Sequence, residues 1–194
     1  MSEIFSLADK TALITGSTGY LGEVMAKGLA EAGAKVYLNG LNEEKVKKLI
    51  KEINLDVEPA VFDITNEIQV ISFFKSISGK PIDILVNNAY SGNAGSIETA
   101  TSQDYALSYD VTVIAVQNIV QNAMPMLKLA AKKNGQASVI NIASMYGLVS
   151  PDMSVYSEKK SSNPPFYGAA KAALIQWTKY AACEFGVDGV RFNS

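Results

Sequence analysis

The chain has 194 residues, which is enough for one domain with a sizeable core. Apolar residues make up 48% of the chain and charged residues 19%, a composition that excludes an intrinsically disordered protein. Seventeen basic and 19 acidic residues give a formal net charge of −2, which argues against a nucleic-acid-binding surface. Histidine is absent, which excludes Ser-His-Asp and Cys-His catalysis and makes most catalytic zinc sites implausible.

Signals for a cellular compartment are few. Cys183 is the single cysteine, so an internal disulfide is excluded and a reducing compartment is the simplest expectation. The N-terminal segment is polar and acidic rather than basic and apolar, and no apolar run reaches membrane-spanning length. We therefore expect a cytoplasmic protein that binds neither nucleic acid nor a membrane.

Short β-branched runs alternate along the chain with longer segments of helical period. The expected strands are nearly continuous apolar runs, which suits strands covered on both faces. They are Thr11–Thr15, Lys35–Asn39, Val57–Phe62, Ile82–Asn87, Ala137–Ile142 and the closing segment Gly189–Ser194. The expected helices between them are Gly22–Ala32, Glu43–Ile53, Glu67–Ile77, a long one over Gln103–Lys133, and Tyr167–Phe185. This alternation predicts the α/β class, a doubly wound parallel sheet in three α/β/α layers, as one domain over residues 1–194.

Local signals support the helix ends. Asn42 precedes two glutamates and predicts an N-cap, and Asn66 with Gln69 has the spacing of a capping box. Gly33 and Gly135 are placed to end the helices before them.

A glycine-rich turn separates the first strand from the first helix. Gly16 permits a tight turn, Gly19 allows backbone amides to approach a pyrophosphate, and Gly22 allows the helix to pack closely on the strand. The N-terminus of the helix would then offer free N–H groups to the phosphates. A glycine triplet alone is a weak signal, but its place between strand and helix favours a dinucleotide site over a ligand-free turn.

From this turn onward the sequence resembles the short-chain dehydrogenase/reductase family, over essentially the whole chain. Its glycine motif is a variant with Tyr20 at the usual middle glycine. Asp63 follows the third strand and Asn87-Asn88-Ala89 follows the fourth, with Tyr90 where a glycine usually comes next. The resemblance implies a Rossmann fold in which the aspartate contacts adenine and the Asn-Asn-Ala segment supports sheet and cofactor.

The resemblance assigns the NAD(P)-binding residues at the carboxyl ends of the strands. They are Gly16, Ser17, Thr18, Gly19, Tyr20, Leu21, Gly22, Asn39, Asp63, Ile64, Asn88, Ala89, Tyr167 and Lys171. At the end of the second strand, an acid would indicate NAD and a nearby arginine NADP. Asn39 is neutral and Leu41 stands where NADP-preferring relatives often carry arginine, so the sequence favours NAD.

Two Tyr-x-x-x-Lys matches compete for the catalytic role. Tyr156–Lys160 runs into Pro164-Pro165, which would end a helix, whereas Tyr167–Lys171 opens a strong helical pattern. Reducing a carbonyl requires a proton donor, and a free tyrosine has a pKa near ~10, which a nearby cation lowers. Tyr167 and Lys171 are therefore the predicted pair.

The resemblance completes the catalytic set. Lys171 would supply the charge and hold the nicotinamide ribose, and Ser144 would orient the substrate oxygen. The asparagine of the family aligns with Thr112, counted back from Pro125, so this set departs from the common one. The irregular segment Tyr146–Phe166 is either a functional lid or a tolerated insertion, and its length resembles dehydrogenases of bacterial surface-carbohydrate synthesis.

These observations predict an NAD(P)-dependent oxidoreductase that interconverts a secondary alcohol and a ketone, on a small molecule such as a sugar or surface-glycan precursor. The alternative is a non-catalytic NAD(P)-binding sensor or subunit. By resemblance, a homodimer or homotetramer would pair through the two long helices. Family members continue beyond a sixth strand, so the resemblance also implies a chain truncated at its C-terminus, lacking the last strand and the substrate lid.

Overall fold

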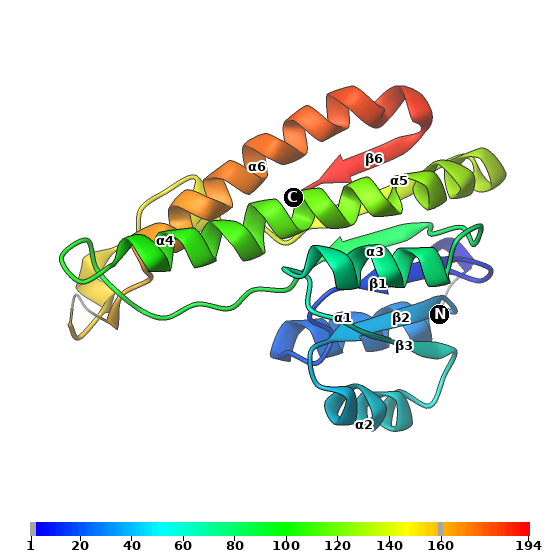
Figure 1. Ribbon diagram of the computed structural model, residues 1–194, viewed down its shortest axis with the longest axis horizontal. Coiled ribbons are helices and arrows are strands. Elements are labelled where there is room, and N and C mark those ends of the chain that lie inside the picture. Colours follow the sequence, from blue (N-terminus) through cyan, green and yellow to red (C-terminus); the bar gives the residue numbers. More distant parts are fainter. Residues whose placement is uncertain (1–2, 159–160) are drawn as a thin grey trace.

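The computed structural model describes residues 3–158 and 161–194, which contain a six-stranded parallel sheet in the order β3-β2-β1-β4-β5-β6 (Figure 1). The strands are β1 Thr11–Ile14, β2 Lys35–Gly40, β3 Val57–Val61, β4 Ile84–Asn87, β5 Ala137–Asn141 and β6 Val190–Asn193. The order reverses between β1 and β4, where such sheets bind ligands. The predicted doubly wound fold is confirmed.

Helices cover both faces of this sheet. They are α1 Tyr20–Glu31, α2 Glu43–Ile53, α3 Glu67–Ser76, α4 Ser102–Tyr109, α5 Ala115–Asn134 and α6 Pro165–Phe185. In β1, Ala12 and Ile14 belong to the core under α1 and α2, whereas Leu13 belongs to the core under α3, α5 and α6. The strands are therefore buried on both sides, as their continuous apolar runs predict.

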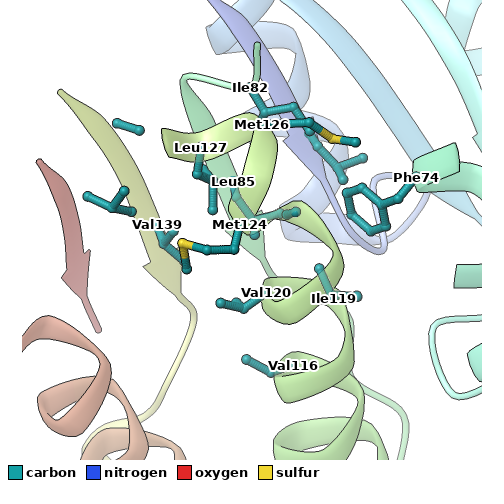
Figure 2. Close-up of a cluster of buried hydrophobic side chains, with 14 of the residues drawn as sticks. Phe74, Ile82, Leu85, Val116, Ile119, Val120, Met124, Met126, Leu127 and Val139 are labelled. Carbon is teal, nitrogen blue, oxygen red and sulfur yellow. The ribbon is translucent and has the colours of Figure 1, made fainter. Parts of the chain in front are cut away.

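The larger core lies between α5 and the centre of the sheet (Figure 2). Leu85 of β4 and Val139 of β5 pack against Ile119 and Leu127 of α5, and all four are almost completely buried. This packing fixes α5, and with it the segment that precedes it, against the strands whose carboxyl ends form the site.

The long helix predicted over Gln103–Lys133 is interrupted. Its middle, Asp110–Ile114, is a π-helical segment between α4 and α5, and it contains Thr112. A π turn still looks helical in a sequence pattern, so hydrophobic period does not reveal it. Such insertions often occur at functional sites.

Other boundaries shift by at most two residues. The helix α6 begins at Pro165 rather than Tyr167, because a proline fits the first turn of a helix. Asn42 caps α2 as predicted, and Gly33 and Gly135 follow α1 and α5 with positive φ. The predicted capping box is half formed. The Asn66 side chain accepts from the backbone N–H of Gln69, but the Gln69 side chain accepts from the backbone N–H of Asp63 instead of that of Asn66.

Membrane insertion has no support among the helices described here, since none is both long and apolar enough to cross a bilayer.

Candidate active site

A cleft of about 700 Å³ runs along the carboxyl ends of the strands beside the switch point between β1 and β4. The predicted cofactor residues that line it are Gly16, Thr18, Gly19, Tyr20, Leu21, Gly22, Asn39, Asp63, Ile64, Asn88 and Ala89. Tyr90, Phe166 and residues of α4 extend the cleft toward α6. The sequence thus brings most of its predicted binding residues to one place.

The glycine turn is shaped by close backbone approach. Gly16 has a φ of +63°, and a Cβ there would lie 2.9 Å from the Ala89 Cα. A Cβ on Gly22 would overlap the Gly16 carbonyl oxygen. Gly19 is the N-cap of α1, and it lines the cleft together with the first residues of that helix. The positive end of the helix dipole therefore faces the cleft, and no side chain caps it.

Buried side chains hold this turn in place. Asn39 accepts from Gly16 N at 3.2 Å and donates to the Ala60 and Phe62 carbonyls at 2.9 and 3.0 Å. Its amide is therefore fully engaged within the protein, and it supports the turn rather than offering a free group to a ribose. Ser17 is fully buried and donates to the Asn39 carbonyl, so the prediction that it contacts the cofactor is not matched by its position.

Thr15 is a supporting residue that sequence reasoning missed. Its hydroxyl accepts from the amides of Asn88 and Ala89 at 2.9 and 3.1 Å, while the Asn88 side chain donates to the Thr15 carbonyl. These bonds join the glycine turn to the segment after β4. A threonine directly before the first glycine was the available signal.

Lys171 lies on α6 one turn after Tyr167, with its ammonium 5.6 Å from the Tyr167 ring centroid. The lysine is 4% exposed and donates to the Ile142 carbonyl at 2.6 Å. Burial lowers the pKa of Lys171 to about 8. The competing pair is not helical at Tyr156, which has an extended backbone, and Lys160 lies outside the described residues.

Ser144 is held beside the same helix. Its hydroxyl accepts from Tyr146 N at 3.1 Å and caps the 3₁₀ turn Met145–Gly147, which packs directly on α6. The approach is close: a Cβ on Gly147 would lie 2.9 Å from the Ala172 amide nitrogen. Two small residues, Gly147 and Gly168, thereby allow the turn after β5 to sit against the turn that carries Tyr167.

Thr112 is buried in the π segment, which packs on α6. Its hydroxyl has no hydrogen-bond partner among the described residues, an uncommon state for a buried polar group. The structure therefore places an unpaired hydroxyl on the element where the sequence predicts a proton-relay residue.

A chain of side-chain hydrogen bonds ties α6 to the sheet. Asn87 donates to Asn141, Asn141 donates to Thr178, and Thr178 donates to the Leu174 carbonyl. These links fix the height of α6 over β4 and β5.

A nicotinamide dinucleotide fits these residues. The N-terminus of α1 and the glycine turn suit a diphosphate, because both line the cleft and a helix N-terminus offers free N–H groups and a partial positive charge. Asp63 and Ile64 line the cleft beside β3, where the adenosine half would bind. Tyr167 and Lys171 are not among the lining residues, but the Lys171 ammonium lies 5.3 Å from the ring centroid of Tyr90, which is one of them. The cleft also includes Lys45, a cation that sequence reasoning did not consider.

Comparison with known proteins agrees with this geometry. The family model of short chain dehydrogenases matches residues 10–194. Gluconate 5-dehydrogenase of Gluconobacter oxydans is 31% identical over 98% of this chain and 71% of its own length. The Pseudomonas aeruginosa RhlG/NADP active-site complex has a TM-score of 0.89 at 27% identity, covering 100% of this chain and 73% of that one. A Brucella melitensis 3-ketoacyl-(acyl-carrier-protein) reductase complexed with NADH has a TM-score of 0.82 at 28% identity, covering 96% and 74%.

Proposed function

The chain belongs to the short-chain dehydrogenase family and is an NAD(P)-dependent oxidoreductase acting on CH–OH groups, and we propose that it interconverts a secondary alcohol and a ketone through Tyr167. The observation that carries this proposal is the Tyr167–Lys171 pair on α6, with a buried ammonium 5.6 Å from the Tyr167 ring centroid and next to Tyr90, which lines the same cleft as the glycine turn. The cofactor, when bound, supplies or accepts the hydride.

The proposal gives each of these residues a defined role. The Tyr167 hydroxyl gives a proton to the carbonyl oxygen in reduction and takes it back in oxidation. The Lys171 ammonium favours the phenolate between these steps and binds the nicotinamide ribose. Ser144 donates a hydrogen bond to the substrate oxygen and orients it, and Thr112 holds a water that returns the proton to solvent.

The test is Tyr167→Phe. Turnover should fall by about 10²- to 10⁴-fold, because the proton donor is lost, while the dissociation constant for NADH stays unchanged. Tyr156→Phe is the matched control, since Tyr156 belongs to the rejected pair, and its turnover should equal that of the unmodified protein. The opposite pattern in the two variants would refute the choice of pair.

The rival function is a non-catalytic NAD(P)-binding sensor or subunit. The departures at Thr112 and Tyr20 favour it, whereas the intact Ser144, Tyr167 and Lys171 set favours an enzyme. A screen of ketones and sugar derivatives by nicotinamide absorbance separates the two. Tight NADH binding with no absorbance change for any compound would support the sensor.

For the cofactor, the finer proposal is that NAD binds more tightly than NADP. Leu41 is exposed at the end of β2 and offers no charge to a 2′-phosphate. Lys45 is the residue that could offer one. Comparison of the two dissociation constants tests the preference, and Leu41→Arg should shift it toward NADP. If NADP binds better and Lys45→Ala removes that advantage, Lys45 is the phosphate partner and the NAD proposal fails.

For the substrate, the finer proposal is a hydroxyl or keto group on a sugar derivative. Gluconate 5-dehydrogenase, a relative by sequence, supports the sugar class by its name, while the ketoacyl reductase supports a different one. We also propose a homodimer that pairs through α5 and α6. Tyr180 of α6, which is 69% exposed, supports this pairing. Light scattering of the unmodified protein and of Tyr180→Lys tests it.

A further inference from the structure

Tyr90 occupies an unexpected place beside the proposed catalytic pair. It follows Asn88 and Ala89 after β4, and its ring meets the Tyr167 ring at 4.9 Å between centroids with an interplanar angle of 78°. The Lys171 ammonium lies over the same ring, 5.3 Å from its centroid. The cation is thus enclosed by the two rings, since its distance to the Tyr167 centroid is 5.6 Å.

The structure makes room for this ring. A Cβ on Gly92 would overlap the Tyr90 hydroxyl, so the absence of a side chain at position 92 allows the ring to turn inward. The Tyr90 hydroxyl lies beside Ser108, but it is buried without a hydrogen bond of good geometry among the described residues. Burial raises the pKa of Tyr90, so the ring enters the site as a neutral phenol and brings no negative charge.

The surroundings of Lys171 leave few other groups that could stabilise its charge. On the described residues, its ammonium has one hydrogen-bond acceptor, the Ile142 carbonyl, and no carboxylate partner. Asp104 and Asp110 line the same cleft from α4 and the π segment. Asp104 is engaged by Thr101, and neither forms an ion pair with the lysine.

Other titratable groups on elements packed against α6 are engaged elsewhere: Asp188 pairs with Lys128, and Tyr105 lies edge-on to Phe166. Tyr146, in the turn on α6, shares a hydrogen bond with Tyr156. Arg191 of β6 donates to Gln136. Besides the Ile142 carbonyl, the electron-rich faces of the two aromatic rings are therefore the described groups that compensate the buried ammonium. Such faces attract cations most strongly where water is excluded.

We propose that Tyr90 is a positioning residue whose ring holds the protonated ammonium of Lys171 against Tyr167. The role of Lys171 rests on the proposed function, but the protonation of its amine is measured without turnover. Failure of this inference is therefore distinguishable from failure of that function. The ring face, and not the hydroxyl, carries the effect. Phenylalanine should therefore replace Tyr90 without loss, and an electron-poor ring of the same shape should not.

The experiment is a pH titration of Lys171 by NMR, with lysine isotopically labelled at Cε and the Lys171 resonance assigned by its loss in Lys171→Met. The unmodified protein should titrate with a midpoint of about 8. Tyr90→Phe should keep that midpoint. Pentafluorophenylalanine at position 90, which has a similar shape but a reversed ring quadrupole, should lower it by about one pH unit, as should Tyr90→Leu.

Tyr109→Leu is the matched control, because Tyr109 is an exposed tyrosine at the end of α4 whose ring makes no described contact with the Lys171 ammonium, and the Lys171 midpoint should be unchanged. Thermal unfolding monitors each variant, and the fluorinated side chain keeps the test valid if leucine prevents folding. Equal midpoints for phenylalanine and pentafluorophenylalanine at position 90 would overturn the proposal. A shift of the same size in Tyr90→Phe or Tyr109→Leu would also overturn it.

Discussion

The glycine turn and the proposed catalytic cluster lie at the same edge of one sheet, yet they differ in how their buried polar atoms are satisfied. Around the turn, Asn39 uses its whole amide on three backbone groups, and the Thr15 hydroxyl receives two backbone amides. Within the described residues, the buried side-chain atoms without a hydrogen-bond partner all belong to the part of the chain from the last residue of β4 to the segment just before α6. They are Asn87 Oδ1, Tyr90 Oη, Thr112 Oγ1 and Asn163 Oδ1.

The difference has a functional meaning. A turn that binds phosphates through its backbone must hold one shape, so the surrounding side chains are committed to fixing it. A site that moves a proton needs groups whose hydrogen bonds and charges respond to substrate. Buried Lys171 and Thr112 reduce the stability of the free protein to provide them. Substitutions in the first region should therefore destabilise the fold, whereas some in the second should stabilise it.

The largest expected effect is that of Gly22→Ala. The new Cβ would overlap the Gly16 carbonyl, which is backbone and cannot move without opening the turn. We expect a loss of about 3 kcal/mol or more in unfolding free energy, measured in urea, and no detectable NADH binding. Gly28→Ala is the control on the same helix, where a Cβ meets nothing within 4 Å. It should gain up to about 1 kcal/mol, and equal destabilisation of both variants would contradict the close approach.

Asn39→Ala should cost nearly as much. It leaves one amide and two carbonyl groups of the backbone unpaired, at about 1 kcal/mol each, so unfolding free energy should fall by about 3 kcal/mol. Asn42, three residues further, caps α2 in an exposed position and is the matched control. Asn42→Ala should cost about 1 kcal/mol. Similar losses in the two variants would show that Asn39 is not a specific support of the turn.

The first region was largely predictable from sequence. Spaced glycines between a β-branched run and an amphipathic helix have few structural solutions, because each glycine lies in close contact with other backbone. Gly19 and Gly22 contact the nearby Gly16, and Gly16 contacts Ala89 after the neighbouring strand β4. Leu13 and Ile14 likewise belong to cores on opposite faces, as continuous apolar runs predict. The same pattern logic located α6 and thereby chose Tyr167 over Tyr156.

The second region was less predictable, because its features depend on contacts distant in sequence. The inward turn of Tyr90 requires Gly92 beside it and α6 opposite it, and no periodicity encodes that meeting. The π segment adds one residue to a helical turn without changing the composition of the run. In the first region, only the support of the turn had the same origin: Asn39 was predicted as a cofactor contact, and Ala60 of β3, to whose carbonyl it donates, becomes its neighbour only once the sheet forms.

Lys171→Met should change stability in a pH-dependent way. The folded pKa of Lys171, about 8, lies below its unfolded value of 10.5, so the folded protein binds the proton less tightly. Stability of the unmodified protein should therefore rise with pH between about 8 and 10.5, while that of Lys171→Met should not. Near neutral pH the methionine variant should be more stable by up to about 3 kcal/mol, with turnover lost.

Urea titrations of both proteins at several pH values measure this difference. A stability gap that does not change with pH would mean that the pKa of Lys171 is the same in the folded and the unfolded protein, so that burial does not disfavour the charged amine. The comparison between the two regions would then fail at its strongest point, because the buried cation would cost nothing.

The smallest expected effect, and the one most specific to the comparison, is that of Thr112→Val. Valine has nearly the shape of threonine and removes a buried hydroxyl that has no described partner, so the unfolding free energy should rise by about 1 kcal/mol. Ser108→Ala is the control from the adjoining helix α4. Its hydroxyl is equally buried but donates to the Phe166 carbonyl at 3.2 Å, so its removal should cost about 1 kcal/mol.

If the two variants change the unfolding free energy in opposite directions, hydrogen bonding and not burial alone decides what each buried hydroxyl contributes to stability. Turnover measurements then show whether the Thr112 hydroxyl, which lowers stability, also serves the reaction. If Thr112 holds the relay water, Thr112→Val should lose turnover while gaining stability, and its NADH affinity should stay unchanged. A variant that is more stable and equally active would remove Thr112 from the mechanism. A less stable one would mean that the hydroxyl is satisfied in the folded protein, and that the π segment resembles the glycine turn more than its unpaired oxygen indicates.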